Sequence, residues 1–246
     1  RCPMPHESNS ICRWSKRAGH VRDFPSVGLI ECSTCLLVVH ERDLKERISY
    51  ETGTMHLWAS GYGNNLESPY DDIPRRIEAI SSLAKQFKIQ KVLDFGSGKG
   101  EMLEALQSDF DVKGLEPEVH ARQICVEAGF SVETSADVYI KLSETFDLVT
   151  LFHVVEHFYE PQNELSKIYK LLAPGGLLVL ETPNSQDALL TIYNSDPFSK
   201  FTYWSHHPML HSQASLTNLL SSSGLNVIKN VGIQRYGLAN HLYWLA

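Results

Sequence analysis

Three closely spaced glycines, Gly96, Gly98 and Gly100, are the residues of this chain best suited to holding a ligand. They follow residues 92–95, a short apolar run that predicts a buried strand, and they precede residues 101–107, which predict a helix. Glycine permits positive φ and lets a ligand approach the backbone closely, and the start of a helix presents N–H groups. The turn therefore predicts a ligand cradle.

A carboxylate follows at the spacing that a nucleotide site needs. Residues 112–115 predict a second strand, and Glu116 ends it, roughly 20 residues after the first strand, as in a nucleotide-binding βαβ unit. A carboxylate in this position can accept hydrogen bonds from both hydroxyls of a ribose. The two segments together predict a nucleoside-binding site at the carboxyl ends of parallel strands.

Three motifs carry a resemblance to a known family. Asp94 directly before Gly-x-Gly-x-Gly resembles motif I of the class I S-adenosylmethionine-dependent methyltransferases. His-Val-Val-Glu-His at 153–157, after a predicted central strand at 145–152, and Leu-x-Pro-Gly-Gly-x-Leu at 172–178 resemble two further motifs of that family. The resemblance implies an α/β, Rossmann-like seven-stranded sheet with helices on both faces, in which residues 226–231 and 236–244 supply the last, antiparallel strands.

The resemblance also implies S-adenosylmethionine as cofactor and a set of binding residues. Asp137 could accept a hydrogen bond from the adenine amino group or could cap a short helix at 138–142. His153 would lie near the ribose or methionine part of the cofactor, or serve as a polar group at a helix start, the role we prefer for His157. The implied cofactor-binding residues are Asp94, Gly96, Ser97, Gly98, Gly100, Glu116, Pro117, Ala136, Asp137 and His153.

The segment 198–211 is rich in aromatic residues and histidine, which suits an acceptor pocket because histidine can move a proton near neutral pH. We expect the catalytic base to be His207, His206 or His211, with Tyr203 as a further candidate. The three histidines could instead bind a metal, but no carboxylate accompanies them at ligand spacing. The predicted reaction is in-line methyl transfer to a small molecule such as a sugar, a polyketide or antibiotic, or a quinone-like compound.

Four of the five cysteines fall within the first 35 residues, and Cys32 and Cys35 form a Cys-x-x-Cys knuckle. The segment resembles the zinc ribbon that precedes the methyltransferase domain in sugar C-methyltransferases. Cys2, Cys12, Cys32 and Cys35 are the predicted ligands of a structural Zn²⁺. The alternatives are a mixed set that includes His6, a ribbon that has lost its metal, and disulfides in a secreted protein.

Composition limits the remaining possibilities. A net charge of −7 over 246 residues argues against a nucleic-acid backbone binder, and no apolar run approaches the length of a membrane span. We expect a cytoplasmic protein with a small-molecule substrate and, as one possibility, a homodimer. The predicted organisation is a zinc-ribbon-like module at 1–45, a linker, lid and first helix at 46–90, and a methyltransferase domain at 91–246 with a substrate insert at about 185–215.

Two other functions compete with this interpretation. An NAD-dependent oxidoreductase would need its third glycine at the position of Glu101, and it would need a Tyr-x-x-x-Lys pair that the central region does not contain. A binding or scaffold protein would use the zinc ribbon and leave the methyltransferase fold inert. The intact glycine turn and Glu116 argue against the scaffold.

Overall fold

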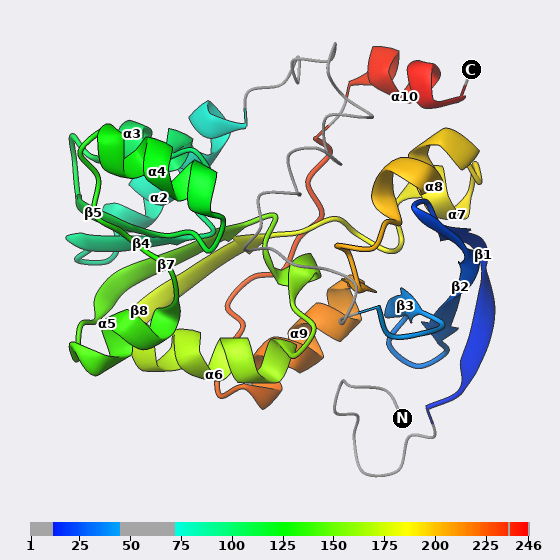
Figure 1. Ribbon diagram of the computed structural model, residues 1–246, viewed down its shortest axis with the longest axis horizontal. Coiled ribbons are helices and arrows are strands. Elements are labelled where there is room, and N and C mark those ends of the chain that lie inside the picture. Colours follow the sequence, from blue (N-terminus) through cyan, green and yellow to red (C-terminus); the bar gives the residue numbers. More distant parts are fainter. Residues whose placement is uncertain (1–11, 45–71, 236, 246) are drawn as a thin grey trace. The chain divides into compact units, whose positions relative to one another are not determined.

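The computed structural model describes residues 12–44, 72–235 and 237–245, and Figure 1 shows its ribbon. Its contacts divide the chain into two compact units. Unit 1 comprises Arg1–Ile48, Val155–Leu165 and Thr182–Ala246, and unit 2 comprises Ser49–Val154 and Ser166–Glu181. Both units are discontinuous in sequence.

Unit 2 is built on a parallel sheet of five strands. Their order is β6-β5-β4-β7-β8. The bounds are β4 (Lys91–Phe95), β5 (Asp111–Leu115), β6 (Val132–Glu133), β7 (Phe146–Phe152) and β8 (Leu172–Glu181). In the register, Asp94 of β4 lies between Gly114 of β5 and Thr150 of β7. The carboxyl ends of these strands therefore share one edge, where open α/β sheets bind ligands.

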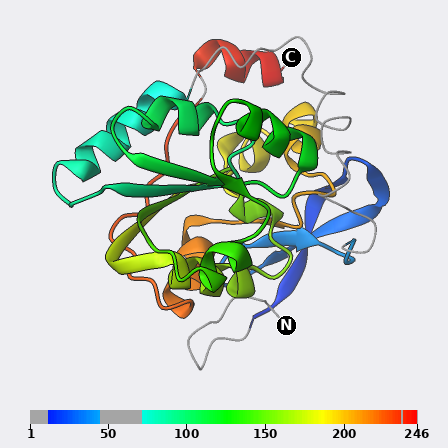
Figure 2. The ribbon, with the colours of Figure 1, turned by 60° about the vertical axis from the view of Figure 1, so that its left-hand side comes forward.

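Helices cover both faces of this sheet. On one face lie α2 (Ile73–Ala84), α3 (Glu101–Leu106) and α4 (Val119–Glu127), and on the other lies α5 (Ala136–Lys141), as Figures 1 and 2 show. The next helix, α6 (Pro161–Leu171), leads into β8. Ile80 of α2 packs in one core with Val92, Met102 and Leu148. The apolar face of α2 is thus part of the core of unit 2.

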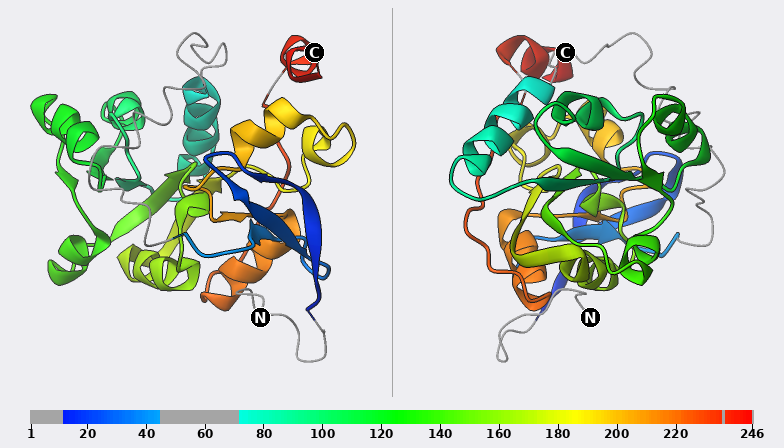
Figure 3. Two further views of the ribbon diagram at one scale, coloured as in Figure 1. Left: turned by 45° about the vertical axis from the view of Figure 1, so that its right-hand side comes forward. Right: turned by 90° about the vertical axis from the view of Figure 1, so that its left-hand side faces the viewer.

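Unit 1 contains an antiparallel sheet in the order β1-β2-β3-β9. Its strands are β1 (Trp14–Val21), β2 (Phe24–Cys32), β3 (Val38–His40) and β9 (Met209–Leu210), and Figure 3 shows β1 and β2 as a long hairpin. The helices are η3 (Val155–His157), α7 (Ala188–Thr191), α8 (Asp196–Thr202), α9 (Gln213–Ser222) and α10 (Leu238–Leu245). The core joins strand residues such as Leu29 to Phe198 and Trp244.

The prediction of two final strands was wrong. Residues 225–235 form no regular element, and α10 stands where the second strand was expected. Ile228 and Val231 are 74% and 54% exposed, so this segment is not packed against a sheet. Trp244 is buried against Phe198 and Phe201, with ring centroids 5.4 and 5.3 Å away. The described residues therefore provide five strands of the predicted seven-stranded sheet.

Residues 41–44, which follow β3, are not helical. The predicted linker and lid lie largely outside the described residues, which resume at Asp72. Among the helices of the described ranges, none has both the length and the apolar character that a membrane crossing requires.

Candidate functional site

The glycine turn between β4 and α3 adopts a conformation that needs glycine. Gly96, Gly98 and Gly100 all have positive φ, at 82°, 53° and 91°. A Cβ on Gly96 would lie 2.5 Å from Val154 Cγ2, whereas a Cβ on Gly98 would meet no atom within 4 Å. Gly96 is therefore required by packing, while Gly98 leaves its backbone open to an approaching ligand.

Glu116 reaches from the end of β5 to this turn. Its carboxylate accepts a hydrogen bond from the Gly98 N–H (2.9 Å) through Oε2 and one from the Glu118 N–H (2.8 Å) through Oε1. Burial raises the pKa of Glu116, although these two hydrogen bonds favour the charged form. The structure thus brings together the glycine turn and the carboxylate that the sequence predicted as partners.

A cavity of about 170 Å³ opens beside the turn, within unit 2. Asp94 lies in its wall and accepts a hydrogen bond from Thr150 Oγ1 (2.7 Å). Burial raises the pKa of Asp94 to about 6. The lining residues are Ile73, Arg76, Asp94, Gly96, Ser97, Gly98, Lys99, Glu101, Met102 and Phe152. The site therefore combines backbone donors, carboxylates and two cationic side chains.

A pair of arginines is the part of this site that sequence reasoning missed. Arg75 and Arg76, in the first turn of α2, bind the two carboxylate oxygens of Glu181 at 2.6 and 2.7 Å. Burial alone would raise the pKa of Glu181, but the two guanidinium groups lower it to about 2. Adjacent arginines directly after Pro74 were the available signal, which an analysis of apolar periodicity does not detect.

His153, at the end of β7, belongs to the same group of side chains. Its φ is 59°, an uncommon value for a residue other than glycine, and its Nε2 lies 3.8 Å from Glu181 Oε1. Ligand atoms of Asp72, His153 and Glu181 lie within 4.8 Å of one another. Because both arginines already neutralise Glu181, this group is better explained as an ion-pair network than as a metal site.

The other predicted cofactor residues follow β4, β5 and β6. Ser97 and Ala136 are buried, and Pro117 is half-buried. Asp137 is mostly exposed, with one oxygen 3.5 Å from Lys167 Nζ. Their contact with a cofactor stays a prediction.

Three of the four predicted bases are buried in unit 1. Burial lowers the pKa of His206 and of His211 to about 4. His206 stacks on Trp204, and His211 Nδ1 lies 3.2 Å from Ser215 Oγ. Burial raises the pKa of Tyr203 to about 12. In this conformation these groups are poor proton acceptors at neutral pH, and their contacts are those of core residues.

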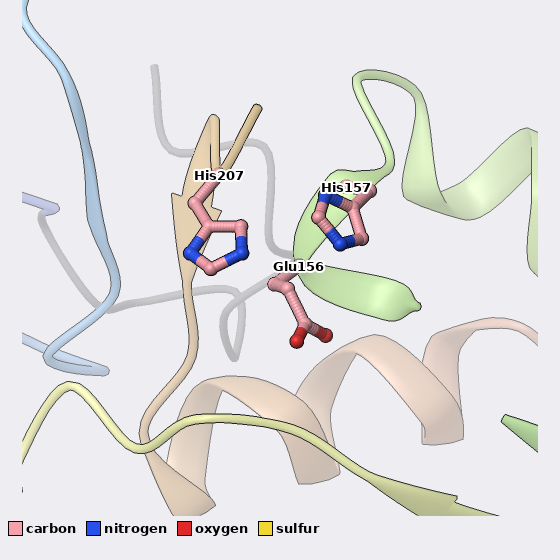
Figure 4. Close-up of side chains that lie close together, drawn as sticks. All are labelled: Glu156, His157 and His207. Atoms are coloured by element: carbon pink, nitrogen blue, oxygen red, sulfur yellow. The ribbon is translucent and has the colours of Figure 1, made fainter. Parts of the chain in front are cut away.

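The fourth candidate, His207, is half-buried and lies beside Glu156 and His157 of η3 (Figure 4). The His157 and His207 ring centroids are 4.8 Å apart. His207 Nδ1 lies 2.8 Å from the Thr202 carbonyl oxygen. The sequence singled out His157 and His207 separately, but it gave no sign that Glu156 would join them.

The predicted zinc ligands are only partly described. Cys12 Sγ and Cys32 Sγ lie 3.0 Å apart, and Cys32 and Cys35 are buried on either side of a turn. Burial acts to raise the pKa of Cys32, but the hydrogen bonds from Cys12 and the neighbouring backbone lower it overall. Cys2 and the alternative ligand His6 lie outside the described residues.

Two solved structures share the fold of this chain. The plantazolicin methyltransferase BpumL in complex with SAH aligns with a TM-score of 0.54 and 16% identity over 70% of each chain. The plantazolicin methyltransferase BamL aligns with a TM-score of 0.55 and 16% identity over 73% of this chain and 72% of that one. These likenesses establish a Rossmann-like methyltransferase fold.

Sequence comparison gives the family. The ubiquinone biosynthesis O-methyltransferase of Pectobacterium atrosepticum is 34% identical over 45% of this chain, and the match spans 50% of that enzyme. The enzyme of the same name from Escherichia coli O6:H1 is 27% identical over 60% of this chain and 64% of its own length. The methyltransferase domain family matches residues 65–230, a segment that contains the glycine turn, Glu116 and His153. The chain therefore belongs to the methyltransferase domain family.

Proposed function

We propose that this chain transfers a methyl group from S-adenosylmethionine to a hydroxyl group of a small molecule. The observation that carries the proposal is the hydrogen bond from the Gly98 N–H to Glu116 Oε2, because it joins a buried carboxylate to the glycine turn that lines the cavity. The O-methyltransferase names of the relatives support oxygen as the methylated atom.

The residues of unit 2 fit the cofactor. Each oxygen of Glu116 accepts one backbone hydrogen bond, and a carboxylate oxygen can accept a second one from a ribose hydroxyl. Gly98 offers its backbone without a Cβ, and the side chain of Lys99 in the cavity wall adds a positive charge for a carboxylate. S-adenosylmethionine supplies an activated methyl group on a sulfonium, so the protein chiefly binds, orients and excludes water.

Among the four predicted bases, we propose His207 as the group that accepts the proton of the acceptor hydroxyl. Its Nδ1 donates to the Thr202 carbonyl, because a carbonyl oxygen can only accept, and this tautomer has its lone pair on Nε2. The burial of His206, His211 and Tyr203 argues against those three.

The experiment measures binding and turnover separately. Calorimetric titration with S-adenosylhomocysteine tests the cofactor site, and transfer of labelled methyl from S-adenosylmethionine to a panel of phenols, sugars and hydroxylated quinone precursors tests the acceptor. His207→Gln should lower kcat at least tenfold and leave S-adenosylhomocysteine affinity unchanged, while the exposed His120→Gln serves as the matched control. A wild-type chain that does not bind S-adenosylhomocysteine would refute the proposal.

We also propose the structural zinc predicted from the cysteines. The 3.0 Å separation of the Cys12 and Cys32 sulfurs supports it, because two cysteine sulfurs that lie close together can bind one zinc ion. Purified protein should then contain more zinc than the Cys32→Ser variant, whereas Cys125→Ser, at a buried cysteine of unit 2, should keep the zinc content of the wild type. Equal zinc content in both variants would contradict the assignment.

A further inference from the structure

A carboxylate and two imidazoles converge in unit 1, apart from the cysteines. Glu156 and His157 come from η3, and His207 comes from the segment between α8 and β9. One ligand atom of each side chain lies within 4.8 Å of those of the other two, and Figure 4 shows the three side chains grouped together. The spacing is compatible with a single ion bound by all three residues.

Backbone carbonyls fix the protonation pattern of both imidazoles. His157 Nδ1 lies 2.6 Å from the His206 carbonyl oxygen, and His207 Nδ1 lies 2.8 Å from the Thr202 carbonyl oxygen. A carbonyl can only accept, so each Nδ1 carries the hydrogen and each Nε2 carries a lone pair. Metal-binding histidines are oriented in this same way, by donation of the second ring N–H to a carbonyl or carboxylate.

The position of Glu156 also favours a cation. The residue is fully buried, and its Oε2 accepts a hydrogen bond from Thr182 Oγ1 (2.9 Å), which holds the carboxylate in place. A buried carboxylate is stable only with opposing charge and hydrogen bonds. A cation bound with His157 and His207 would supply that charge.

We propose that Glu156, His157 and His207 form a binding site for a divalent transition metal, with Zn²⁺ as the preferred ion. Two imidazole nitrogens and one carboxylate oxygen suit Zn²⁺, whereas Mg²⁺ and Ca²⁺ prefer oxygen ligands. Three protein ligands leave a fourth position of a tetrahedral ion for water or an acceptor oxygen. The carboxylate that the histidine-rich segment lacks in sequence is thus supplied by Glu156, about 50 residues earlier.

This inference does not depend on the proposed methyl transfer. An ion on His207 Nε2 would withdraw that lone pair from proton transfer, so the turnover assays above are done with a chelator present. Binding of S-adenosylhomocysteine and binding of the metal are measured separately, and either can fail while the other succeeds.

The test uses Co²⁺ as a spectroscopic substitute for Zn²⁺ in the chelator-treated full chain. Thiolate ligands give cobalt an intense charge-transfer absorption, whereas nitrogen and oxygen ligands give only the weaker visible bands, so the cysteine site and the proposed site are distinguishable. We expect one cobalt equivalent without thiolate absorption, displaced by Zn²⁺ and not by Mg²⁺. His207→Gln should weaken this binding at least tenfold, and His120→Gln should leave it unchanged.

Glu156→Gln removes a buried charge and could alter folding, so each variant is also compared with wild type by thermal unfolding. For the wild type, X-ray absorption of the bound zinc gives a readout that needs no substitution. Two imidazole ligands and one carboxylate would support the site. The inference is overturned if the wild type binds cobalt only through thiolates, or if His207→Gln and His157→Gln both retain wild-type affinity for the second equivalent.

Discussion

Replacing Glu116 by alanine should abolish tight binding of S-adenosylhomocysteine. A hydrogen bond to a charged acceptor contributes about 1.5–3 kcal/mol. With two ribose hydroxyls on the carboxylate of Glu116, and water replacing part of the loss, we expect a cost of about 2–4 kcal/mol. That range corresponds to a decrease in affinity of about 30-fold to 1,000-fold, since 1.4 kcal/mol is tenfold. Isothermal titration calorimetry measures it directly.

The same substitution also removes two internal hydrogen bonds. The N–H groups of Gly98 and Glu118 lose their acceptor, so the free energy of unfolding should fall by about 1–3 kcal/mol. Glu118 provides the matched control, because its buried carboxylate caps α4 by accepting from the His120 and Ala121 N–H groups at 2.9 and 2.7 Å. Loss of such a helix cap lowers the free energy of unfolding by about 0.5–2 kcal/mol. Neither of the two hydrogen bonds that Glu118 accepts involves the glycine turn.

The two variants should therefore lose comparable stability, but only Glu116→Ala should lose affinity. Glu116→Gln should fall between wild type and Glu116→Ala, because it keeps an oxygen acceptor without the charge. The reasoning is refuted if Glu116→Ala binds S-adenosylhomocysteine within threefold of wild type. It is also refuted if Glu118→Ala weakens binding as much as Glu116→Ala does.

Three further predictions concern unit 2. The pKa of Glu181 is lowered from 4.5 to about 2, so its stabilising contribution is fully present above pH 4.5 and is lost as the pH falls toward 2. Urea denaturation should therefore show wild type to be more stable than Glu181→Gln by up to about 3 kcal/mol at neutral pH, and this difference should shrink between pH 4.5 and 2. A difference that stays constant over that range would count against the ion pairs. Gly98→Ala should lower the free energy of unfolding by only about 1–2 kcal/mol, since its added methyl meets open space, but it should weaken the binding of S-adenosylhomocysteine. Gly96→Ala should destabilise the fold further, because its methyl clashes with Val154. Calorimetry measures the binding and chemical denaturation the stability, and equal stability of the two variants would disprove the packing argument. Leu148→Ala, in the fully buried centre of β7, should lower the free energy of unfolding by about 2–5 kcal/mol in a denaturant titration, and a change below about 1 kcal/mol would show that β7 is less tightly packed than described.

Local sequence signals were sufficient for the cofactor half of the site. The order of strand, glycine turn and helix around Gly98 can be predicted because the apolar run and the glycines are contiguous. Glu116 could be predicted because a βαβ unit has a nearly fixed length. Neither prediction needed knowledge of a contact between distant residues.

Contacts between distant residues account for what the sequence did not reveal. Arg75 and Glu181 are 106 positions apart, and no periodicity relates them. The carboxylate of Glu156 meets His207 only after about 50 intervening residues have folded. The apolar run of α10 is too short to distinguish a helix from a strand by pattern, and the structure shows that a helix forms.

The pairing of β3 with β9 has a consequence for how the chain folds during synthesis. Val38 pairs with Leu210, so the partner strand leaves the ribosome about 170 residues later, which corresponds to roughly 10 to 35 seconds at typical elongation rates. Throughout that interval the β3 edge carries unsatisfied N–H and C=O groups, the arrangement that promotes aggregation of nascent chains. Chaperones that hold extended segments should therefore raise the yield of this protein in expression, and truncation before Met209 should make it insoluble.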